Sequence, residues 1–204
     1  MEPADRQRTP TPDASSRADG PQDATVEATD ALPFDAAQIR EVNHAVSLAE
    51  EIVSNAYKMS ATQWLRRRYD VKTLVDLSDA EIVSGPFAQV IRYEGQKSDT
   101  SLGSAAYDFY KICLQDHTIR DTLDKHPDLN LMPFVLYIVT HELIHIVRFS
   151  QFLQSFQATP AEMMAEEHRV HRQTRELLEN IRVAGMDAVL GFFVRWHEPI
   201  DGMQ

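Results

Sequence analysis

One segment constrains the fold of this chain more than any other. Residues 132–156 are apolar nearly all the way round a helix, and Pro133 suits a first helical turn. A helix without a broad polar face is normally buried on most sides. His141, Glu142 and His145 interrupt this apolar run. Because burying three polar side chains is costly unless they are paired or bind an ion, we predict a central helix whose polar residues share a partner.

The spacing of these three residues favours a metal ion as that partner. Residues four apart lie on one face of a helix, so His141 and His145 can point at one ion. Neutral imidazoles bind Zn²⁺ well, and the ion lowers the pKa of its water to about 7. Glu142 projects ~100° away from His141 and can approach that water from the side. We predict His141 and His145 as ligands and Glu142 as the catalytic base.

The segment His141-Glu142-Leu143-Ile144-His145 resembles the HExxH signature of the zincin metallopeptidases, of the gluzincin-like kind. Its context is similar too. It lies on a predicted helix. A predicted strand lies upstream, where zincins carry the sheet that binds extended substrate, and a predicted acid-bearing helix follows. The resemblance implies a zinc-dependent protease, a hydrolase that cleaves peptide bonds in a peptide or protein substrate. It also implies a third ligand, which in gluzincins is a Glu on a following helix.

A helix with candidate third ligands is predicted downstream. Thr159 is its N-cap, Pro160 and Glu162 occupy its first turn, and it runs to about residues 184–185, where glycine ends it. The residues on this helix that could bind a metal are Glu162, Glu166, Glu167, His168 and His171.

Helical phase ranks these residues. At ~100° per residue, Glu167 falls within ~40° of the apolar centre of the helix and Glu166 within ~60°, on opposite flanks. We therefore expect Glu167 or Glu166 as third ligand and prefer Glu167. The acid that gluzincins usually carry four residues after the ligand is replaced here by Val170 or His171. His171 shares a face with Glu167, so we expect it to orient Glu167, stabilise an oxyanion or bind a second metal, unless it is a surface residue.

Two other classes of function are compatible with the same residues. Glu142-x-x-His145 is also the ExxH pattern of di-iron carboxylate bundles, and Glu41-x-x-His44 repeats its spacing on an earlier helix. However, Glu41 and His44 lie ~90–150° from the apolar face of that helix, which argues against a shared site. The third class is a catalytically silent zincin-like scaffold with an interaction or regulatory role.

The other elements complete an α+β fold that is mostly helical. We predict helices over residues 36–68, from Ser78 to residue 85, over 117–125 and over 186–195, and two antiparallel strands over 87–93 and 106–114. Cys113 is the only cysteine and is expected to be a buried packing residue, so no disulfide is possible within the chain.

Composition separates a tail from this domain. Of the 204 residues, residues 1–35 hold eight acidic side chains against three basic ones, and five of the ten prolines. We expect residues 1–35 to be a disordered acidic tail and residues 36–204 to form the domain. The net charge of −11 argues against nucleic acid or an anionic membrane as a partner. With no signal peptide or membrane span recognised, we expect a cytoplasmic location; the sequence leaves the oligomeric state open.

Overall fold

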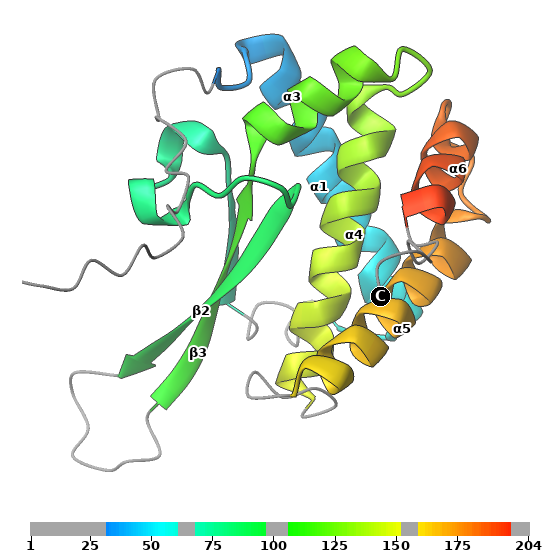
Figure 1. The fold of residues 1–204 in the computed structure, drawn as a ribbon. Helices are drawn as coiled ribbons and strands as arrows, with labels where there is room; N and C mark the ends of the chain where they lie inside the picture. The colour runs from blue at the N-terminus through cyan, green and yellow to red at the C-terminus, as the bar shows by residue number, and fades with distance from the viewer. Residues whose placement is uncertain (1–31, 61–67, 97–105, 152–158, 197–204) are drawn as a thin grey trace, which may run out of the picture.

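The long helix α4 (Leu131–Ser150) forms the centre of the fold in a computed structural model (Figure 1). A small sheet lies on one side of α4, α5 (Pro160–Leu178) and α6 (Met186–Trp196) lie on the other, and α1 (Ala36–Ala56) packs along it. The residues that the structure describes are 32–60, 68–96, 106–151 and 159–196. The predicted α+β fold, mostly helical around a central HExxH helix, is confirmed.

Helix α4 is buried over almost its whole length. From Leu131 to Arg148, only Met132 and Glu142 escape full burial. We predict no membrane span from the sequence, yet α4 is long and apolar enough to cross a membrane by length and composition. Since 89% of its most apolar window is buried inside the protein, α4 has the surroundings of a core helix.

Helix α1 supplies a second wall of the core. Asp35 caps it, because its carboxylate accepts hydrogen bonds from the backbone N–H groups of Ala37 (2.7 Å) and Gln38 (2.9 Å). The prediction that this helix runs to residue 68 is wrong. It ends at Ala56 in a turn where Lys58 has a φ of 51° and the Met59 N–H donates to the Ser54 carbonyl. Glycine usually marks such an end, and none stands here.

The sheet is mixed rather than antiparallel. β2 (Ala88–Gln96) pairs antiparallel with β3 (Ala106–Leu114), as we predict, but β1 (Arg68–Lys72) pairs in parallel on the other side of β3. A five-residue strand carries little local signal, because its stability comes from hydrogen bonds to the neighbouring strand. That dependence explains why β1 is not evident from the sequence.

Smaller elements agree with the sequence in part. α3 (Asp116–Lys125) matches the predicted short helix. The helix predicted from Ser78 is only a 3₁₀ turn, Asp79–Glu81. Helix α5 ends at Leu178, before the glycine that we predict as its end. Gly185 instead precedes α6 with a φ of 84°, where a Cβ would lie 2.9 Å from the Asn130 side chain.

The folded part begins earlier than the predicted domain boundary. Residues 1–31 of the predicted tail lie outside the described residues. Phe34 is buried in the core, and its backbone N–H donates to the carboxylate of Asp116 at 2.9 Å. An aromatic residue directly before the N-cap of α1 can pack beneath the helix, so residues 32–35 are held although their composition resembles the tail.

Candidate metal centre

The two histidines of the HExxH segment face each other on one side of α4. Their Nε2 atoms are 3.1 Å apart, and both side chains are buried. The four-residue spacing on a helix brings the rings together, as we predict. One Nε2–H can donate to the other Nε2, or two unprotonated nitrogens can share one cation between them.

Glu167 from α5 completes a compact set of ligand atoms. Its Oε1 lies 3.1 Å from His141 Nε2, and its Oε2 lies 3.3 Å from His145 Nε2. A tetrahedral ion with ligands at 2.0–2.1 Å would separate its ligand atoms by about 3.3–3.4 Å. The observed separations are close to these values, but they join both oxygens of Glu167. They are compatible with an ion of this size held by His141, His145 and Glu167.

His171, one turn after Glu167, belongs to the same cluster. Its Nε2 lies 3.0 Å from Glu167 Oε1, and its ring centroid is 4.1 Å from that of His141. A carboxylate only accepts hydrogen bonds, so with no ion the His171 Nε2–H donates to Glu167. His171 Nδ1 then accepts from the hydroxyl of Tyr137 at 2.9 Å. His141, Glu167 and His171 also meet the spacing that a metal site needs.

The pKa shifts in this cluster favour the protonation states that bind a cation. Burial holds the pKa of His141 well below its ordinary value, so this imidazole is neutral at neutral pH. Burial alone would raise the pKa of the Glu167 carboxyl, but the three neighbouring imidazoles lower it instead. A neutral imidazole and an ionised carboxylate are the forms that bind Zn²⁺.

Glu166 is held away from the cluster by two arginines. Its carboxylate pairs with the Arg148 guanidinium, which donates through Nε and through Nη2 (3.1 Å to Oε2), and with Arg169 Nη1 at 2.5 Å. Burial alone would raise the pKa of this carboxyl, but Arg148 and then Arg169 lower it. Of the two glutamates that we predict as third ligand, the structure brings only Glu167 to the histidines.

Glu142 lies between the two histidines in sequence and is partly buried. Burial raises the pKa of its carboxyl to about 7. A cation on the neighbouring histidines would lower this pKa again by attraction. The buried Nδ1 of His141 has no hydrogen-bond partner among the described residues, a departure from zinc sites in which the second ring nitrogen is bonded.

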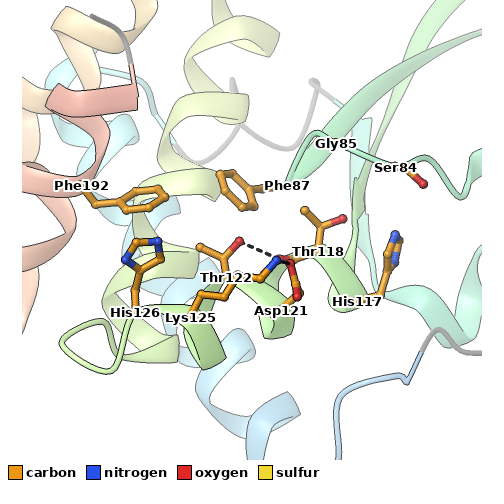
Figure 2. A pocket seen from close by; sticks show the side chains of 10 residues that line it. All are labelled: Ser84, Gly85, Phe87, His117, Thr118, Asp121, Thr122, Lys125, His126 and Phe192. Carbon is orange, nitrogen blue, oxygen red and sulfur yellow. Dashed lines mark hydrogen bonds and ion pairs between the residues drawn. The ribbon is translucent and has the colours of Figure 1, made fainter.

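A cavity beside α3 lies away from the histidines (Figure 2). It has a volume of about 470 Å³ and lies between α3, the segment before β2 and α6. Several of its polar groups are already paired: Lys125 with Asp121 at 2.6 Å, and the Thr122 hydroxyl with the Thr118 carbonyl. This cavity shares no lining residue with the histidine–glutamate cluster, so we do not assign the chemistry to it.

The other predicted residues fall outside the cluster. Glu162 caps the start of α5 through Thr159, and His168 is exposed. Glu41 and His44, the second half of the di-iron pattern, are both exposed on α1. Sequence reasoning missed Arg148 as the partner of Glu166. Its place in an otherwise buried apolar run is the signal that could have revealed it.

Comparisons with protein-family models, with curated proteins and with solved structures find no match to this chain. The assignment of function therefore rests on the geometry of the cluster and on the HExxH segment.

Proposed function

We propose that this protein is a zinc-dependent metallopeptidase. The observation that carries the proposal is the convergence of His141, His145 and Glu167 from two helices, with contacts of 3.1–3.3 Å between their ligand atoms. The donor set of two imidazoles and one carboxylate is that of catalytic zinc sites with an open fourth position. When bound, the zinc ion would supply a Lewis acid and lower the pKa of a coordinated water to about 7.

The remaining catalytic roles in the proposal belong to side chains of the chain itself. His141, His145 and Glu167 hold the ion. Glu142 accepts a proton from water as the water attacks the peptide carbonyl, and donates it to the leaving amine as the C–N bond breaks. His171 lies beside the ligands, and its Nδ1 accepts from the Tyr137 hydroxyl. Its Nε2–H can therefore donate to the developing oxyanion once Glu167 binds the ion. The substrate is a peptide or a protein.

A second candidate function is a closed metal site without catalysis. His171 Nε2 is 3.0 Å from Glu167 Oε1, close enough for His171 to act as a fourth protein ligand. Structural zinc sites have four protein ligands and no open position. Under this alternative the domain is a zinc-stabilised scaffold for interaction or regulation.

One variant separates these proposals. Glu142→Gln keeps the size of the side chain but cannot take up a proton. The peptidase proposal expects it to bind one zinc per chain, by elemental analysis, and to lose at least ~100-fold of the cleavage rate on a peptide library. A wild-type protein that binds one zinc and cleaves no peptide would favour the scaffold. Two irons per chain would favour the di-iron class instead.

A further inference from the structure

A separate pocket adjoins the metal cluster on the side of α6. It has a volume of about 270 Å³. Its lining includes Tyr137, His168, His171, Arg172, Arg175 and Phe193. Tyr137 and His171 thus belong both to this pocket and to the surroundings of the metal ligands. A group bound here would lie next to the reacting atoms of the proposed site.

The charge of the pocket is opposite to that of the chain. The chain has a net charge of −11, yet the pocket lining holds two arginines and two histidines and no acidic residue. Among the described residues, Arg172 and His168 have no hydrogen-bond or ion-pair partner, while Arg175 Nε pairs with Glu179 at 2.5 Å. Arg172 can therefore form an ion pair with a bound anion without breaking an existing one.

The rest of the pocket lining is largely apolar. Phe193 stacks on Tyr137 with ring centroids 3.8 Å apart and an interplanar angle of 7°, and Leu190 is buried beside it. Ligand pockets combine such apolar walls with a few polar groups that fix orientation. The volume is slightly below the ~300–1,000 Å³ of typical small-molecule sites, so one residue of a peptide fits better than a larger ligand.

We propose that this pocket, which we call the arginine pocket, binds a carboxylate of the peptide substrate close to the scissile bond. The inference rests on the proposed peptidase function. Planar guanidinium groups suit carboxylates because they donate two parallel hydrogen bonds. The carboxylate can be the C-terminus of a short peptide or an Asp or Glu side chain.

Calorimetric binding to inactive Glu142→Gln protein, both with zinc and without metal, tests this inference. The probes are acetyl-Ala-Phe-Ala as the free acid and as the amide, and acetyl-Ala-Phe-Asp-amide beside its Asn counterpart. We expect at least one carboxylate peptide to bind about tenfold more tightly than its neutral partner. Preference for the free acid identifies the chain end as the source, and preference for Asp identifies the side chain.

Matched variants test whether the preference for a carboxylate peptide depends on the arginine pocket. Arg172→Gln should remove the tenfold preference and Arg175→Gln should reduce it. Arg182→Gln makes the same change of charge at an exposed position beyond α5 and should leave the preference intact. A carboxylate that bound only to zinc or to the histidines would be equally insensitive to Arg172→Gln and Arg182→Gln. That result, or equal binding of acid and neutral peptides, would overturn the inference.

Binding and cleavage measured on the same peptides separate the arginine pocket from the peptidase activity. Cleavage of acid and neutral peptides at equal rates, with equal binding, would leave the peptidase standing without the arginine pocket. Arg172-dependent binding of a carboxylate with no cleavage by the wild-type protein would leave the pocket standing and reject the peptidase.

Discussion

Nε2 of His141 lies 3.1 Å from a carboxylate oxygen of Glu167, although the two residues belong to different helices. The contact depends on the way α5 packs against α4. Because His141 is neutral at neutral pH, the pair is not a salt bridge there. A neutral imidazole N–H can donate to the carboxylate without an ion, and the same two atoms can bind one cation when the nitrogen carries no proton.

Replacement of Glu167 should weaken zinc binding strongly. We expect Glu167→Ala to lower the zinc affinity by ~100-fold or more, since losing a ligand costs more than the ~10–100-fold seen for outer-shell residues. Competition with a chromophoric chelator measures this affinity. The neighbouring Glu166→Gln is the matched control: it should change zinc affinity less than tenfold. Its effect should instead be on stability, by about 3 kcal/mol, because it leaves Arg148 buried and unpaired. An equal loss of zinc affinity in both variants would contradict the ligand assignment.

Replacement of His171 should separate an open from a closed metal site. If His171 only supports the ligands, His171→Ala should lower zinc affinity by no more than ~10–100-fold and less than Glu167→Ala does. The same chelator competition measures the two variants side by side. Tyr137→Phe, which removes only the hydrogen bond to His171, should retain zinc almost fully. A loss as large for His171→Ala as for Glu167→Ala would identify His171 as a fourth ligand.

The acid stability of the protein should depend on Glu81. Lys111 first, then the Ser78 N–H and the Tyr93 hydroxyl, lower the pKa of its carboxyl to about 2. Because the folded-state pKa lies below the unfolded value, the stabilisation is present above the ordinary pKa and is lost as the pH falls towards 2. The difference in unfolding free energy between wild type and Glu81→Gln should thus be constant near neutral pH and shrink between about pH 4.5 and pH 2.

Guanidinium unfolding at a series of pH values measures this difference. Tyr93→Phe, which removes one of the donors but keeps the carboxylate, should show a smaller effect with the same direction. A difference that stays constant down to pH 2 would show that Glu81 does not titrate in this way.

Asp116 should be important for anchoring the start of the folded part. Its carboxylate is fully buried and accepts hydrogen bonds from the backbone N–H groups of Phe34 (2.9 Å) and Leu74 (3.1 Å). Asp116→Ala leaves both donors without a partner, so we expect a loss of roughly 2–4 kcal/mol in chemical unfolding. Asp116→Asn keeps one acceptor oxygen and should lose less. Amide exchange at Phe34 and Leu74 should accelerate in the Ala variant, and unchanged exchange there would contradict the anchoring role.

The central helix and its two histidines follow from local pattern alone. An uninterrupted apolar run predicts a buried helix at α4, and a four-residue spacing places His141 and His145 on one face regardless of the rest of the fold. Capping residues likewise predict the start of α5 at Thr159. The ends of α1 and α5 were less predictable, because no glycine stands where either helix stops.

Packing between segments far apart in the chain determined the third residue of the cluster, the strand β1 and the arginine pocket. Helical phase placed both Glu166 and Glu167 near the apolar face and could not separate them, since either flank of α5 could have met α4. The buried guanidinium of Arg148 forms an ion pair with Glu166, and the carboxylate of Glu167 contacts the histidines instead. The strand β1 and the arginine pocket were also set by partners far away in the chain, β3 and α6. Local periodicity determines which residues of an element share a face, whereas contacts between elements determine what that face meets.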